Sequence, residues 1–138
     1  PHHSRSLMAK GMNLLEEGKD FNAAIDAFTR AAEVDPLGED YGETVIFFCH
    51  LGNRDWEKAN QSLDREMREN NHSRYFGFKA SVLAHQGKVS ESKEWLLKYQ
   101  KERPEIKTMD DYKSVAPDLN NEIKELMIEG MRLAGLPE

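Results

Sequence analysis

Hydrophobic residues recur at helical spacing through most of the chain, in segments bounded by glycine, proline, asparagine or aspartate. Such spacing places the hydrophobic side chains of one segment on a single face of an α-helix. Six helices are predicted before residue 104, at 5–17, 21–34, 40–51, 56–70, 74–86 and 90–102. The sequence therefore predicts an all-α fold.

The residues that separate these segments repeat at a nearly fixed distance. Gly18 and Gly52 are 34 residues apart, and Gly52 and Gly87 are 35 residues apart. Pro36 and Pro104 are separated by 68 residues, which is twice 34. Because several landmarks share one period, the chain is expected to contain three helix–turn–helix units.

Each landmark has a physical reason to recur. The three glycines fall where the first helix of a unit ends and the chain turns sharply, which often requires a positive φ. Small residues are expected where the two helices of a unit cross, at Ala24, Ala59 and Ser92. Asp20 and Asp55 are placed to cap the second helix of their units.

The residue types at this period resemble those of the tetratricopeptide repeat (TPR), a helix–turn–helix unit of about 34 residues. The first unit carries the resemblance most clearly, in Gly18-Lys19-Asp20-Phe21-Asn22-Ala23-Ala24-Ile25 and Asp35-Pro36. The second unit departs from the family pattern at Glu66 and Asn70-Asn71, and the third departs at Ser92. The resemblance implies an α-solenoid of about three TPR-like repeats, over 5–36, 40–71 and 74–104.

Residues 105–138 leave the repeat pattern and are expected to form a C-terminal capping segment. Thr108 and Asp111 have the spacing of a capping box, so a short helix is expected to begin there. A last helix is predicted over 118–134, with Gly130 marking a close helix approach and Gly135 ending it in the left-handed conformation. Its hydrophobic face is predicted at Leu119, Ile123, Leu126, Met127 and Leu133. This helix either caps the last repeat or forms a dimer contact.

The end of the chain carries a second resemblance. The residues Pro104-Glu105-Ile106, Thr108, Tyr112 and 129–138 (EGMRLAGLPE) look like the C-terminal end of certain bacterial signalling proteins. In that family, a class III adenylate or guanylate cyclase domain is followed by repeats of this kind. The resemblance implies that the chain is the C-terminal part of a larger protein, since no cyclase motif can be placed in its 138 residues.

Charge and composition narrow the classes of partner. The 19 Lys and Arg residues are interleaved with 25 Asp and Glu residues, which gives a net charge of −6 and argues against nucleic acid as the main partner. No hydrophobic run approaches the roughly 20 residues that a membrane-spanning helix needs. The single Cys49 lies in a hydrophobic run and is expected to be buried, which fits a reducing, cytoplasmic location. No signal peptide is recognised, and residues 1–4 are interpreted as vector-derived.

Catalytic and metal-binding motifs are not found. His50, His72 and His85 are scattered, and the glycines do not form a phosphate-binding loop. Neither a metal nor a cofactor is predicted, and the chain is not expected to be an enzyme.

A binding surface is predicted instead from the TPR resemblance, which implies that the first helix of each unit lines a concave groove. The projected groove residues are Asn13, Tyr41, Val45, Phe48, Arg74, Phe78, Ser81 and His85. An aromatic centre with one arginine suits an extended peptide or a docked helix. The alternative is that Val45 and Phe48 belong to the core and that the chain's own last helix fills the groove. The carboxylate clamp of co-chaperone repeats is not expected, because Asn13 and Arg74 match only two of its five positions.

The predicted function is a protein–protein interaction scaffold, as the regulatory or assembly end of a larger bacterial signalling protein such as an adenylate cyclase. Two alternatives stay open: a stand-alone peptide-binding adaptor, and an enzyme with an unrecognised site. The expected partner is a protein or peptide, or a second copy of the chain.

Overall fold

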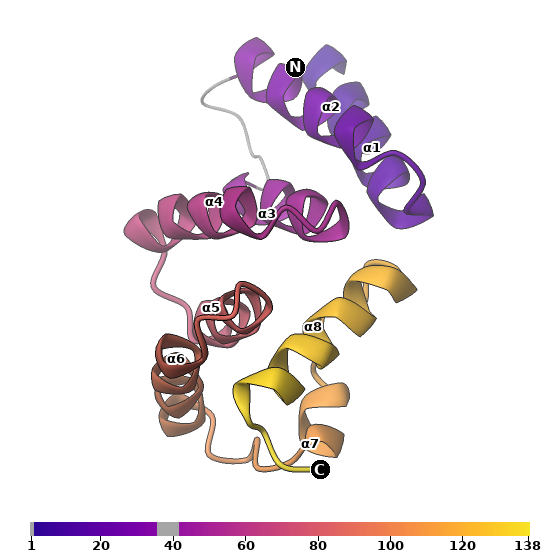
Figure 1. Cartoon of the computed structure of the whole chain (residues 1–138). Helices are drawn as coiled ribbons and strands as arrows, with labels where there is room; N and C mark the ends of the chain where they lie inside the picture. The colour runs from indigo at the N-terminus through magenta and orange to yellow at the C-terminus, as the bar shows by residue number, and fades with distance from the viewer. Residues whose placement is uncertain (1, 36–41) are drawn as a thin grey trace.

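The computed structural model describes residues 2–35 and 42–138. Eight α-helices form the described part of the chain, and consecutive helices pack as antiparallel pairs (Figure 1). Their bounds are α1 His2–Glu17, α2 Phe21–Val34, α3 Gly42–Gly52, α4 Trp56–Glu69, α5 Arg74–His85, α6 Val89–Glu102, α7 Met109–Lys113 and α8 Asn121–Ala134. The predicted all-α class is confirmed, and a helix lies at each of the six segments predicted before residue 104. Pro36 and Tyr41, which carried a repeat boundary and a groove position, lie outside the described residues.

The helix starts follow the predicted capping chemistry. Asp20 accepts a hydrogen bond from the backbone N–H of Ala23 at 2.9 Å, and Asp55 accepts one from Lys58 at 3.2 Å. Gly18 and Gly87 take φ values of +69° and +80° after the first helices of their pairs, as predicted. These local signals end one helix and begin the next within a few residues.

Gly52 plays a different role from the one predicted. It is the last residue of α3 and lacks a positive φ, which Arg54 takes instead at +59°. A Cβ atom on Gly52 would lie 2.5 Å from ring atoms of Phe21, the first residue of α2. The position needs glycine because α2 and α3 pack closely there.

The predicted small residues are buried between paired helices. Ala24, Ala59 and Ser92 are each 0 % exposed. Ser92 compensates for its polarity by donating its hydroxyl to the backbone oxygen of Ala80 at 2.7 Å. Cys49 is also fully buried, and burial raises the pKa of its thiol to about 12, which leaves it protonated and unreactive at neutral pH.

Polar groups tie α4 to α5 across the boundary between two helix pairs. Lys79 is 7 % exposed, and its ammonium group donates to Asn60 at 2.6 Å and to the carboxylate of Asp64. Glu66, where the repeat pattern usually has a small residue, accepts a hydrogen bond from the hydroxyl of Tyr75 at 3.0 Å. Glu66 therefore departs from the repeat pattern at a position where its side chain bonds α4 to α5, the first helix of the next pair.

The segment after α6 forms two helices, as predicted. The second of them, α8, differs from the prediction in its first residue and in one residue of its buried face. Thr108 and Asp111 form the capping box of α7, with reciprocal hydrogen bonds of 2.9 and 3.3 Å. The last helix begins at Asn121 instead of residue 118, because the Asn120 side chain accepts from the N–H of Ile123 at 2.8 Å. Leu133 does not lie on the buried face: it is 47 % exposed. The buried face is formed by Ile123, Leu126, Met127, Gly130, Met131 and Ala134.

α8 packs on the inner side of α5, and Figure 1 shows it crossing beside the α5–α6 pair. Gly130 marks the predicted close approach, since a Cβ atom there would collide with the hydroxyl of Ser81 and lie 2.8 Å from its carbonyl oxygen. Gly135 ends the helix at φ +107°, as predicted. The chain then returns to α7, where the N–H of Met109 donates to the carbonyl oxygen of Pro137 at 2.7 Å. None of the helices in the described ranges is long and hydrophobic enough to cross a membrane.

Candidate interaction surface

The structure divides the predicted groove residues into three groups. Val45 and Phe48 belong to the hydrophobic core, as the alternative prediction held, and Phe78 does too; with the exposed Arg74 they also border hollows on the inner side of α3 and α5. Ser81 and His85 are instead engaged with α8, and Asn13 is exposed on α1 without lining either of these hollows.

α8 covers the inner face of α5 over its second half. Ser81 donates its hydroxyl to the carbonyl oxygen of Met127 at 3.2 Å, and His85 Nε2 donates to that of Leu126 at 2.7 Å. The imidazole of His85 also stacks on Trp56, with ring centroids 4.2 Å apart. The prediction that Ser81 and His85 line an open groove is therefore wrong, because the chain's own last helix fills this part of it.

Aromatic rings form the floor where α8 does not reach. Phe47 and Phe78 stack with centroids 5.6 Å apart, and Phe48 meets the edge of Phe78 at 5.4 Å. Tyr75 extends the cluster with an edge contact to Phe78 at 6.0 Å. Aromatic pairs in this geometry add about 0.5–1.5 kcal/mol each beyond the burial of their area, so this floor is rigid.

A first hollow, the Tyr112 pocket, lies between this floor, α6, α7 and the link that leads to α8. Its volume is about 340 Å³. It is lined by Thr44, Phe48, Arg74, Gly77, Phe78, Tyr99, Arg103, Tyr112, Val115, Pro117, Asp118 and Leu119. Most of this lining is hydrophobic or aromatic, with a few polar groups, as in sites for small organic ligands.

The cationic groups of the Tyr112 pocket differ in their partners. Arg103 forms an ion pair with Glu105 at 2.8 Å, and the hydrogen bond to Glu105 raises the pKa of Arg103 above its ordinary value. The Arg74 guanidinium lies over the Tyr75 ring at 5.1 Å and donates to the Tyr75 hydroxyl at 3.3 Å. No carboxylate among the described residues forms an ion pair with Arg74, whose side chain is exposed to solvent at the border of the hollow.

Two hydroxyl groups of residues that line this pocket are buried without a hydrogen-bond partner, those of Tyr112 and Thr44. Tyr112 is 2 % exposed, and burial raises the pKa of its phenol above the ordinary range. The phenol therefore keeps its proton and remains a donor. A buried polar group without a hydrogen-bond partner costs about 1–3 kcal/mol of stability. Two such hydroxyl groups in one pocket are therefore unusual.

A second hollow, the Met12 hollow, continues along the inner face toward α1. Its volume is about 510 Å³, and it shares Thr44, Phe48, Arg74 and Leu119 with the Tyr112 pocket. Met12 of α1 and Val45 of α3 extend the hydrophobic lining, and Glu66 and Glu69 of α4 add two carboxylates to it. We call the two hollows together the inner groove; Leu119, from the link before α8, borders both.

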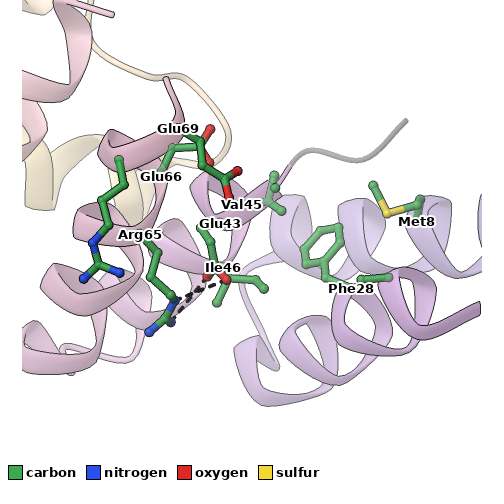
Figure 2. Close-up of a pocket in the computed structure, with 11 residues that line it drawn as sticks. Met8, Phe28, Glu43, Val45, Ile46, Arg65, Glu66 and Glu69 are labelled. Atoms are coloured by element: carbon green, nitrogen blue, oxygen red, sulfur yellow. Dashed lines mark hydrogen bonds and ion pairs between the residues drawn. The ribbon is translucent and has the colours of Figure 1, made fainter. Parts of the chain in front are cut away.

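A third hollow of about 350 Å³ lies between the α1–α2 pair and the α3–α4 pair (Figure 2). Met8 and Phe28 line one side, and Figure 2 shows Glu43 facing Arg65 on the other. These two form an ion pair at 3.3 Å. Arg68 and Glu69 also line this hollow, so its lining carries charges of both signs and lacks the aromatic cluster found in the inner groove.

The described residues do not form a metal centre. In the ranges 2–35 and 42–138, no group of three His, Cys, Asp or Glu side chains is close enough to hold a metal ion. His50 has a pKa lowered chiefly by desolvation and lines none of these three hollows.

Sequence reasoning missed the residues that the C-terminal segment contributes. Tyr112, Val115, Pro117 and Leu119 all lie after the repeats, where no period predicts which face they meet. Tyr112 was recognised only as part of a tail motif.

Comparisons with protein-family models, with curated proteins and with solved structures found no match to this chain.

Proposed function

We propose that this chain is a protein-interaction module of the TPR type that binds an extended segment of a partner protein in the inner groove. The observation that carries the proposal is the aromatic floor of Phe48 and Phe78 beside Arg74, which forms no ion pair with a described carboxylate. Buried aromatic anchors supply affinity in such interfaces, and an arginine beside them fixes the register of a segment that carries a carboxylate.

The location of α8 limits the length of this segment. The groove runs from Met12 to Arg103, because α8 occupies the inner face near Ser81 and His85. A partner segment therefore contacts α1, α3 and the first turns of α5 and passes Leu119.

Peptide selection on the purified chain tests this proposal. Peptides from a random display library are selected on the wild-type protein, and their dissociation constants are measured by fluorescence anisotropy. Arg74→Glu and Leu119→Arg are each expected to weaken binding at least about tenfold, because they reverse the groove charge or place a charge on its hydrophobic border. The matched controls are Arg30→Glu on the exposed side of α2 and Leu97→Arg on α6, which is 67 % exposed. Selected peptides that bind both groove variants as tightly as the controls would refute the proposal.

A second candidate is the assembly end of a larger, cytoplasmic bacterial signalling protein such as an adenylate cyclase. The tail resemblance suggests it, and a hydrophobic outer surface favours self-association. Leu97 is 67 % and Leu133 is 47 % exposed, and Leu97 lines a hollow of about 440 Å³ with Ala134 and Pro137. Light scattering across a dilution series is expected to show a dimer that Leu97→Lys with Leu133→Lys dissociates. A concentration-independent monomer would exclude this role for the outer surface.

A further inference from the structure

The Tyr112 pocket differs from the rest of the inner groove in its size and in the helices that line it. Helices α3, α5, α6 and α7 contribute to its walls, and residues 115–119 border it on the remaining side. Its volume of about 340 Å³ falls within the range of roughly 300–1,000 Å³ typical of sites for small organic molecules. The adjoining Met12 hollow, with about 510 Å³, is bordered by α1 and α4 and suits a chain that continues.

The polar groups of this pocket share one property: each can donate a hydrogen bond. The Tyr112 hydroxyl and the Thr44 hydroxyl are buried and lack partners, and the Arg74 guanidinium lacks a carboxylate among the described residues. A guanidinium can only donate, and both hydroxyls can donate. Native proteins rarely leave buried donors unpaired, so the group that complements the two buried hydroxyls is a hydrogen-bond acceptor, and the exposed Arg74 guanidinium on the border of the pocket favours an acceptor with negative charge.

The other charges that line the pocket agree with an anion. Arg103 is a second cation, held by Glu105 at 2.8 Å. Asp118 is the one carboxylate among the described lining residues, and it is exposed to solvent. A cleft with hydrophobic walls and an excess of one charge concentrates counter-ions of the opposite sign.

We infer that the Tyr112 pocket binds a small organic acid, with its hydrocarbon part against Phe48, Phe78 and Leu119 and its carboxylate toward Arg74, Thr44 and Tyr112. This site goes beyond the binding of a partner segment, since the ligand is a separate molecule. Arg74 borders both hollows, so the acid occupies the cation that a partner segment requires. The acid therefore competes with that segment and acts as an effector of the interaction.

Matched neutral and charged probes test the inference on the full chain. Calorimetry and NMR titration compare hexanoate, 4-phenylbutyrate and indole-3-propionate with their primary amides, which preserve shape and remove the charge. At least one acid is expected to bind saturably, about tenfold more tightly than its amide. If each acid binds no better than its amide, or if none saturates at about 10 mM, the inference is overturned.

Two variants separate a binding role from a structural one. Tyr112→Phe retains the ring and removes only the unpartnered hydroxyl, so it is expected to weaken acid binding about threefold or more without lowering the thermal midpoint. Tyr75→Phe is the matched control: its hydroxyl bonds to Glu66 at 3.0 Å, and its loss is expected to lower the midpoint. Unchanged acid affinity in Tyr112→Phe would overturn the assignment of that hydroxyl.

Arg74→Gln is expected to bring the affinity of the acid down to that of its amide. Arg68→Gln, an exposed arginine on α4 outside this pocket, is its control. A last measurement distinguishes a free acid from the C-terminus of a protein chain. It compares the affinity of a hexapeptide that ends in phenylalanine with that of the small acids. If the peptide binds more tightly than every small acid, the ligand is a partner's C-terminus and the small-molecule site is refuted.

Discussion

The α1–α2 pair is held together by residues near one another in the sequence, whereas α5 is covered by a helix much further along the chain. Ser4 reaches Ala31 across 27 residues, and Gly18 turns the chain between the two helices. Ser81 reaches Met127 across 46 residues, and Asn120 bonds to the backbone oxygen of Leu15 at 2.6 Å across 105 residues. The first arrangement joins helices that follow one another in the chain, while the second requires the intervening helices to be in place.

This difference teaches where sequence signals are sufficient. A helix hairpin is encoded by caps, turn glycines and small crossing residues, all of which recur at the repeat period. The contact of α8 with α5 has no such recurring signal. It depends on the fit between Gly130 and Ser81, which occurs at one place in the chain. The two regions are therefore expected to respond differently to substitution.

The largest expected effect is from Gly130→Val. Its branched side chain collides with Ser81, so α8 must move away from α5, at a cost of about 3 kcal/mol or more in the free energy of unfolding. Hydrogen exchange is expected to accelerate in α5 and α8 and to change little in α1 and α2. Glu129→Val, on the exposed side of the same helix, is the control for helix propensity. Equal effects of the two substitutions would mean that the close approach contributes little.

Gly52→Ala tests the boundary between the first two pairs. The added methyl group lies 2.5 Å from the Phe21 ring, and the resulting strain exceeds the gain in helix propensity of about 1 kcal/mol. We expect a net destabilisation of about 1–2 kcal/mol in denaturant unfolding. In a Phe21→Leu background the same substitution is expected to be neutral or stabilising, because the ring atoms are absent. A cost that is unchanged in that background would contradict the packing explanation.

Asn120→Ala removes both the cap of α8 and the bond to Leu15. The expected loss is about 1–2 kcal/mol, of which the cap contributes about 1 kcal/mol. Asn121→Ala changes the neighbouring exposed residue and serves as the control. If the two variants unfold at the same denaturant concentration, the contact between α8 and α1 has no energetic weight.

The smallest expected effect concerns pH and Cys49. Its thiol has a pKa of about 12 in the native protein, above the unfolded value of 9.0, so the native state retains the proton over a wider range. Stability is therefore complete below about pH 9 and declines as the pH rises toward 12, by about 1 kcal/mol at pH 10. Cys49→Ala is expected to be less stable at every pH but to show a shallower decline. An identical alkaline slope in both proteins would contradict the assignment.

The sequence predicted six helices, the caps of α2 and α4 and the small residues at the helix crossings, because each signal acts within a few residues. The prediction failed at Gly52, where the reason for glycine is the Phe21 ring of another helix. It also failed for Leu133, because hydrophobic spacing alone does not determine which side of a helix is covered. The start of α8 was missed because Asn120, and not Asp118, supplies the capping side chain.

About half of the candidate site was predicted from the sequence. Val45, Phe48, Arg74 and Phe78 line the inner groove, on the two helices where the sequence pattern predicted them. Ser81 and His85 bond to α8 instead of lining the groove, and no local sequence pattern predicts this contact. The same is true of Tyr112, whose position in the pocket follows from the return of the chain after α6.

The packing of α8 on α5 has a consequence for synthesis on the ribosome. Residues 74–85 are synthesised before residues 121–134, so the inner face of α5, including Ser81 and His85, waits uncovered while about 40 further residues are translated. At roughly 5–20 residues per second this interval lasts seconds, which is long compared with the formation of a helix hairpin. During those seconds the nascent chain presents a hydrophobic surface that the finished protein hides, and it is then that a chaperone has most to gain from binding it.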